Sequence, residues 1–258
     1  MADISPAAVA SLRSRTGVSI LQCKKALEEA KGDEEKAIEI LRRSGEAQAV
    51  KKSAREQSQG AVFLAQSGNK AALVLLKCET DFVARNADFV AFGQECADLL
   101  LKEGKGGLDK KLQGSLPSIV QKLGENISLG SAEVVEAPVL GSYVHTNRKI
   151  GVIVGLSKGS QELARDAAMH AAAMNPLFRT PAEVSSASIE KEKEIWREQL
   201  KKEGKPEQIW DKIMMGKEKK FREESALTSQ VFVKDPTKTV GAHLGDAEVT
   251  HYLRLSFS

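Results

Sequence analysis

The chain has 258 residues, of which 41% are hydrophobic and 28% are charged, enough to bury a core and to form one to three domains. Its 38 basic residues face 35 acidic ones, a near-balance that argues against a dedicated nucleic-acid binder. Cys23, Cys78 and Cys96 are widely spaced and odd in number, so they imply no disulfide framework and favour a reducing compartment. Without an apolar signal core or an apolar run of membrane-spanning length, we expect a soluble cytoplasmic protein with no membrane contact.

Residues 1–45 predict three short helices. Because so small a bundle is marginally stable alone, we interpret residues 1–54 as a docking module with a linker, tethered to a larger core. The polar and basic stretch EAQAVKKSAREQSQG at 46–60 is interpreted as that linker or as a solvated helix. The expected helix starts are Ser5-Pro6, Ser19 and Asp33, and the expected ends are Gly17, Gly32 and Ser44-Gly45.

Two later segments share one pattern of a β-hairpin followed by a helix. Residues 60–77 predict two apolar strands around a Ser-Gly-Asn turn, and a helix is expected at about 87–102. Residues 141–156 predict a second hairpin, and another helix is expected at about 161–174. The stretch KAALVLL aligns without gaps with KIGVIVG, so we predict an α+β fold with a two-lobed core. The lobes are predicted as a subdomain at 55–140 and a second at 141–258.

The segments around these units are less regular. The glycine-rich residues 104–107 are interpreted as a flexible loop, followed by a helix at 116–123 and a strand at 133–136. Alternating residues at 249–257 predict a closing strand for the second lobe. Residues 187–226 are crowded with charges and carry a narrow apolar stripe, which predicts an antiparallel helical hairpin inserted in that lobe.

The motifs of several enzyme classes are missing from the sequence. It contains neither the phosphate-binding pattern G-x-x-x-x-G-K-[ST] nor a G-x-G-x-x-G after a strand. The four histidines are scattered, whereas a zinc site needs closely grouped Cys and His ligands. No G-x-S-x-G nucleophile elbow occurs. We therefore expect no catalytic residue, no metal and no cofactor, and a protein that is not an enzyme.

The stretch KCETDFVARN at 77–86 joins an apolar strand to a helix and places an acid beside a large aromatic residue. In one interpretation, Asp81 caps the helix and Phe82 fills the core. In the other, the two residues form a tip that contacts another protein, because strand-to-helix loops often carry binding residues on a rigid scaffold.

Four parts of the chain, in order, resemble the elongation factor Ts family, the guanine-nucleotide exchange factors of the translation GTPase elongation factor Tu. The most specific is ETDFVAR at 79–85, together with LRSRTG at 12–17 and CKKAL at 23–27. The others are IGVIV at 150–154 with residues 167–176, and QVFV at 230–233 with KTVG at 238–241. Many bacterial members continue into a carboxy-terminal helical module, whereas this sequence stops at Ser258, so we expect that module's contacts to be missing or made differently.

The resemblance implies an amino-terminal three-helix module of the ubiquitin-associated type, two α+β subdomains and an inserted helical hairpin. It implies that Thr80, Asp81, Phe82 and Val83 push against elongation factor Tu near its Mg²⁺ and phosphate site, so that GDP leaves and GTP can bind. Docking by the first module is implied for Leu12, Arg13, Thr16, Gly17, Cys23 and Lys24, with Leu12 and Cys23 expected in its core and Arg13 and Lys24 at its surface.

The resemblance also assigns His145 a weaker contact with the partner. Assembly as a homodimer or a heterotetramer, through the second subdomain or the hairpin, is left open. Direct nucleic-acid binding is not expected. The alternative function is an RNA- or ribosome-associated protein without exchange activity, which would use the lysine-rich linker and the hairpin.

Overall fold

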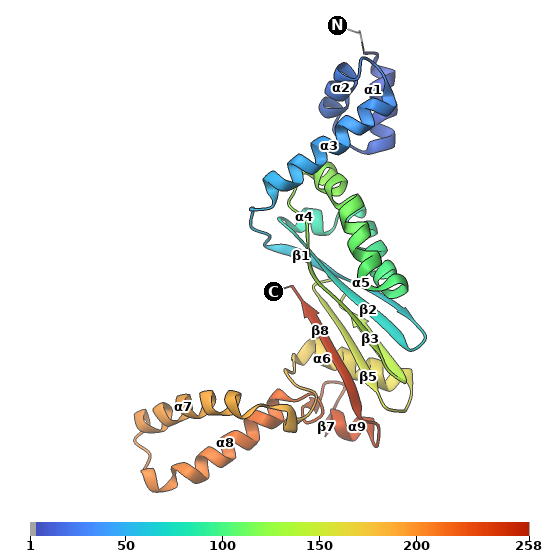
Figure 1. The fold of residues 1–258 in the computed structure, drawn as a ribbon. Helices are drawn as coiled ribbons and strands as arrows, with labels where there is room; N and C mark the ends of the chain where they lie inside the picture. The colour runs from blue at the N-terminus through green and yellow to red at the C-terminus, as the bar shows by residue number, and fades with distance from the viewer. Residues whose placement is uncertain (1–3, 258) are drawn as a thin grey trace.

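The computed structural model describes residues 4–257, so both ends of the predicted division into three parts lie outside the described residues. The molecule is elongated, with a helical module at one end, two sheets in the middle and a helical arm at the other end (Figure 1). Helices and antiparallel strands alternate along the chain, which confirms the predicted α+β class. The subdomain boundaries and the ubiquitin-associated character of the first module stay predictions.

The amino-terminal module consists of α1 (Pro6–Thr16), α2 (Ile20–Glu29) and α3 (Glu34–Lys52). The prediction that α3 ends at Ser44-Gly45 is wrong, because the helix continues along α5 of the next part. Gly45 makes this contact possible: a Cβ there would lie 2.9 Å from Oε1 of Gln121. The three predicted caps are confirmed, since side chains of Ser5, Ser19 and Asp33 accept hydrogen bonds from the backbone N–H groups of Ala8, Gln22 and Lys36.

The first lobe contains β1 (Gln59–Ser67), β2 (Lys70–Cys78), α4 (Asp81–Ala84), α5 (Ala87–Leu123) and β3 (Ser128–Glu136). Its strands form an antiparallel sheet in the order β1-β2-β3, and α5 covers one face of it. The hairpin therefore forms as predicted. The strand that follows α5 starts earlier than the predicted strand at 133–136.

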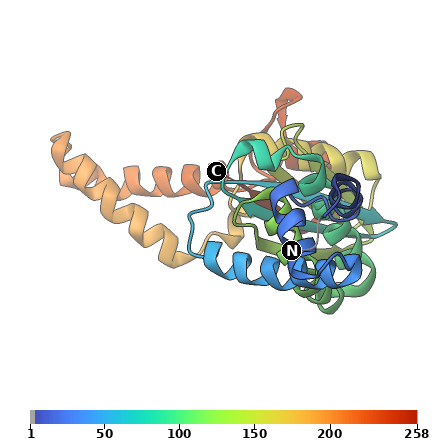
Figure 2. The same ribbon diagram turned by 90° about the horizontal axis from the view of Figure 1, so that it is seen from above.

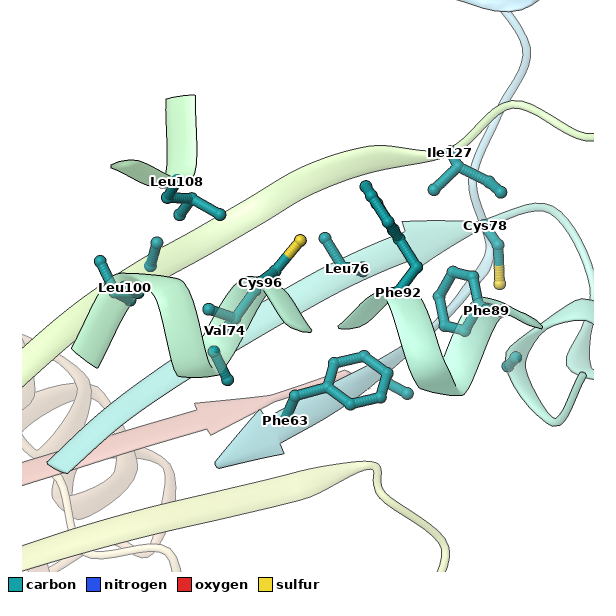
Figure 3. Packing of buried hydrophobic residues seen from close by; sticks show 14 of the residues in the cluster. Phe63, Val74, Leu76, Cys78, Phe89, Phe92, Cys96, Leu100, Leu108 and Ile127 are labelled. Carbon is teal, nitrogen blue, oxygen red and sulfur yellow. The ribbon is translucent and has the colours of Figure 1, made fainter. Parts of the chain in front are cut away.

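The helix α5 is longer than predicted and continues through the supposed flexible loop at 104–107. Gly104 has φ 71° and ψ −166°, so it bends the helix sharply and does not end it. Leu108, beyond the bend, is buried against the same sheet, which explains why the second half of the helix returns to the core. Figure 3 shows this core, with Leu100 and Leu108 at one end and Phe89 and Phe92 at the other.

The second lobe repeats this connectivity with β4 (Val139–Val144), β5 (Ile150–Leu156), α6 (Gln161–Met174) and β8 (Val249–Ser256). The sheet order is β4-β5-β8, so in both lobes a third strand pairs with the second strand of the hairpin. The closing strand is therefore confirmed. α6 packs tightly on β4, because a Cβ at Gly141 would lie 2.0 Å from the backbone nitrogen of Arg165.

The two sheets pack face to face, and α5 and α6 cover the outer faces. The layer between the sheets joins Val62 and Leu73 of the first lobe to Leu140 and Ile153 of the second. The backbone N–H of Val62 also donates to the carbonyl oxygen of Arg148 at 2.7 Å. These contacts make the two lobes one body, so the position of one lobe determines that of the other.

The arm leaves the second lobe after α6 and returns before β8, and Figure 2 shows it extending away from the core. It is the predicted antiparallel helical hairpin, with its own small core around Trp196, Leu200 and Met214. The ring of Trp196 meets that of Phe221 edge-on at 6.0 Å. Its elements are η1 (Pro181–Glu183), α7 (Ser186–Lys202), η2 (Glu207–Ile209) and α8 (Trp210–Ser225), and β6 (Val231–Phe232), β7 (Asp235–Thr239) and α9 (Val240–Leu244) then lead to β8.

Candidate functional site

The loop between β2 and α5 exposes a single aromatic ring. Phe82 lies on the short helix α4 and is 83% exposed, so the interpretation that it fills the core is wrong. The next residue, Val83, is buried and anchors the helix to the first lobe. Because large apolar side chains so exposed are unusual in isolation and typical of contact surfaces, Phe82 is the centre of the candidate site.

The cap of this helix is Thr80, so the prediction that Asp81 is the cap is also wrong. The hydroxyl oxygen of Thr80 accepts a hydrogen bond from the N–H of Val83 at 3.3 Å. Asp81 lies in the first turn, where its carboxylate pairs with Arg85 at 3.1 Å. Both groups of this pair are largely exposed, so the pair contributes little to stability and can rearrange when another molecule binds.

A residue that sequence reasoning missed fastens this loop from below. The carboxylate of Glu125, in the turn after α5, accepts hydrogen bonds from the backbone N–H groups of Glu79 and Thr80, both at 3.0 Å. More than forty positions separate Glu125 from this loop in the sequence, and no local pattern connects them.

A cavity of about 690 Å³ lies between α4 and the turn at 146–149 of the second lobe. Its wall includes Asp81, Arg85, Arg148 and Lys149, so it is polar and carries more positive than negative charge. His145 precedes this turn and is exposed, with Nδ1 3.0 Å from Oδ1 of Asn147. The structure therefore brings the predicted contact at His145 to the same side of the core as the loop that carries Phe82.

The predicted docking residues of the first module fall into two groups. Leu12 and Cys23 are fully buried in the module's core, so their side chains cannot contact a partner, and the docking role assigned to them is corrected to a structural one. Thr16 is half-buried and donates its hydroxyl to the carbonyl oxygen of Leu12, and Gly17 ends α1 with φ 68°.

Arg13 and Lys24 are exposed and line a groove of about 660 Å³ whose other walls are mostly apolar. The exposed Ile20 lies at the same groove. An apolar groove edged by two cations suits a protein surface with apolar side chains and a neighbouring acid. The module therefore offers a second contact surface, separate from Phe82.

The remaining reactive residue types have structural surroundings. Burial raises the pKa of Cys78 to about 12 and that of Cys96 to about 11, so neither thiol is a nucleophile at neutral pH. His170 is buried and its pKa is lowered by burial; Nδ1 accepts from the N–H of Val233, and Nε2 lies 2.9 Å from Oε1 of Gln230.

Within residues 4–257, no group of three or more His, Cys, Asp or Glu side chains is placed to hold a metal ion. Over the same part of the chain, no helix has the length and apolar character needed to cross a membrane.

Comparison with known proteins agrees with the loop that carries Phe82. The sequence profile of the family described as Elongation factor TS matches residues 79–257, which begin at this loop. The chain belongs to the elongation factor Ts family. The family membership confirms the resemblance found in the sequence and makes the chain a translation elongation factor.

Individual relatives named Elongation factor Ts match over nearly the whole chain. The one from Aeromonas hydrophila subsp. hydrophila is 44% identical over 250 residues, covering 93% of this chain and 85% of the relative. The one from Marinobacter nauticus is 41% identical over 263 residues, covering 99% and 91%. The one from Deinococcus radiodurans is 42% identical over 255 residues, covering 95% and 97%. The similarity therefore includes the first module, which lies outside the profile match.

Proposed function

We propose that this chain binds elongation factor Tu in its GDP-bound state and accelerates GDP release, which allows GTP to bind. The observation that carries the proposal is the ring of Phe82, which is 83% exposed on a helix whose other side is anchored in the core. We place this activity in the cytoplasm, and it requires no bond to be made or broken by the chain itself.

The proposed mechanism is mechanical. A GTPase holds GDP through backbone amides around the phosphates and a bridging Mg²⁺. Because Mg²⁺ demands near-ideal octahedral geometry, a small displacement of the groups around it weakens its binding. Phe82 would enter between elements of the partner beside this site, and Asp81 would accompany it. Thr80 and Val83 would act through the helix, as its cap and its anchor.

Two further surfaces would make the insertion of Phe82 favourable. The groove with Arg13 and Lys24 would dock on the partner, and His145 with the turn at 146–149 would contact another part of it. By linkage, GDP must weaken binding of this chain by the same factor by which the chain weakens GDP binding. Since a coupling free energy is typically about 1–3 kcal/mol, several contacts must act together for fast exchange.

The alternative of RNA binding by the arm receives little support from its charges. Lys193 and Arg222 both pair with Glu218, and Lys219 and Lys220 each lie within 4 Å of a glutamate one turn later. Cations that are neutralised in this way form a weak site for phosphates. Salt-sensitive RNA binding in a filter assay, without an effect on a GTPase, would favour this alternative instead.

The test uses elongation factor Tu preloaded with mant-GDP, a fluorescent GDP analogue. We expect the chain to accelerate mant-GDP release, and Phe82→Ala to lower the rate at least about tenfold, because it removes the inserted ring. The matched control is Met215→Ala on the arm, another exposed apolar side chain at 73%, which should leave the rate unchanged. No acceleration by the unmodified chain at micromolar concentration would contradict the proposed function.

A further inference from the structure

We infer that Glu125 is a positioning residue for nucleotide exchange: its carboxylate holds Thr80, and through Thr80 it determines how α4 presents Phe82. The inference rests on the proposed function and goes beyond it, since Glu125 lies outside the loop that carries the ring and is not itself a contact residue in that proposal.

The carboxylate of Glu125 makes three hydrogen bonds to the two residues that join β2 to α4. Oε2 accepts from the backbone N–H groups of Glu79 and Thr80, both at 3.0 Å. Oε1 accepts from the hydroxyl of Thr80 at 2.5 Å. Hydrogen bonds to an ionised acceptor are short and strong, and three of them on one carboxylate hold the backbone at this point in one orientation.

The bond to the hydroxyl also determines how Thr80 caps the helix. A hydroxyl has one proton to donate, and the carboxylate can only accept, so that proton lies toward Glu125. The lone pairs of the oxygen then remain free to accept from the N–H of Val83, at 3.3 Å. Glu125 therefore keeps Thr80 in the rotamer and hydroxyl orientation that the cap needs.

The helix that receives this support cannot hold its shape alone. α4 has four residues, and a single helical turn is unstable in water without outside contacts. Two contacts fasten it to the lobe: burial of Val83 on one side and the Glu125–Thr80 bonds at its start. Because the ring of Phe82 is almost free of contacts with its own chain, only the helix sets its direction.

Glu125 is itself held in a rigid turn. It follows Gly124, which ends α5 with φ 79°, and it precedes the buried Asn126. The N–H of Asn126 donates to the carboxylate of Glu79 at 2.6 Å, and its side-chain amide donates to the carbonyl oxygens of Ser53 and Arg55. The turn thus joins the end of the first module to the loop with Phe82, which gives Glu125 a firm base from which to act.

The first experiment measures mant-GDP release from elongation factor Tu against the concentration of Glu125→Gln. The variant keeps the size of the side chain but replaces an acceptor oxygen by an NH₂ group, which faces N–H or O–H donors. We expect the maximum rate to fall about tenfold, because charge-assisted bonds to the cap are lost. The half-saturating concentration should change less than about twofold, because the docking groove is distant and unaffected.

The matched control is Glu133→Gln on β3 of the same lobe, a partly exposed glutamate whose ion partner is Lys105 and which does not touch the loop. It should behave as the unmodified chain does. A loss confined to the half-saturating concentration, or an unchanged maximum rate, in Glu125→Gln would overturn the inference. No acceleration by the unmodified chain would instead contradict the proposed function.

A double-mutant cycle distinguishes positioning from a general loss of stability. If Glu125 acts through the ring, Glu125→Gln should lower the rate less than about twofold in a chain that already carries Phe82→Ala. An equal loss in both backgrounds would overturn the inference.

Hydrogen exchange in the free chain provides a readout that needs no GTPase. We expect the amide of Val83 to exchange at least about tenfold faster in Glu125→Gln than in Glu133→Gln, because the cap is loosened. Unchanged protection of this amide would contradict the positioning role, whatever the exchange assay shows.

Discussion

Neighbouring residues on α4 have opposite surroundings, and this contrast is the basis of the candidate site. The ring of Phe82 is in solvent, whereas Val83 is buried in the first lobe. A helix turns by about 100° per residue, so one short turn can present one side chain and anchor the next. Phe82 can therefore remain exposed without loosening the loop that carries it.

The buried thiols give a prediction at the same scale. Burial raises the pKa of Cys78 to about 12 and that of Cys96 to about 11, and Cys23 has no exposed surface. At pH 8 the native chain should therefore react with the thiol reagent DTNB at least about a hundredfold more slowly than the chain unfolded in guanidinium chloride. Rapid stoichiometric labelling of the native chain would contradict the burial of these residues.

Among the elements, α5 shows how glycines with different neighbours serve different purposes. Gly93 faces β1, where a Cβ would lie 2.2 Å from the ring of Phe63. Gly114 lies on the same helix with nothing within 4 Å of the Cβ position. The first glycine allows helix and sheet to approach, and the second only weakens the helix.

The two glycines predict opposite effects on stability. Gly93→Ala should lower the free energy of unfolding by about 1–3 kcal/mol, because the added methyl group overpacks the core against Phe63. Gly114→Ala should raise it by up to about 1 kcal/mol, because alanine is the better helix former. Urea unfolding followed by circular dichroism measures both. Equal effects of the two substitutions would show that α5 does not pack on β1 as described.

On the scale of the whole molecule, the proposed contact surfaces and the arm lie at different ends. The first module and α4 lie toward one end, and α7 and α8 extend from the other (Figure 1). The arm has its own core around Trp196, separate from the clusters beneath and between the sheets. The arm is therefore attached to the second lobe without being part of its core.

Shortening the arm tests this separation. Lys193 and Glu218 form an ion pair at 3.1 Å across the two helices, so a short glycine-serine turn can replace residues 194–217. We expect the rate of mant-GDP release to stay within about twofold, because distant sites contribute independently. A larger loss, in a chain whose thermal unfolding is otherwise unchanged, would show that the arm takes part in exchange.

Local interactions explain which elements were predictable. Ser5, Ser19 and Asp33 cap helices through bonds to residues three positions away, and these patterns can be recognised in the sequence. The continuation of α3 past Gly45 and of α5 past Gly104 could not be predicted, because a glycine usually ends or interrupts a helix. Packing of α3 on α5, and of Leu108 on the sheet, outweighs that preference.

The amino-acid sequence by itself determined the helix caps, the two hairpins with their helices, the closing strand and the motif that indicates the family. Those features depend on residues close together in the chain or on a recognisable pattern. Only the tertiary structure decided that Phe82 is exposed while Leu12 and Cys23 are buried, and that Glu125 supports Thr80. Burial and such long-range bonds depend on which distant segments come together, and no local pattern of side chains specifies that.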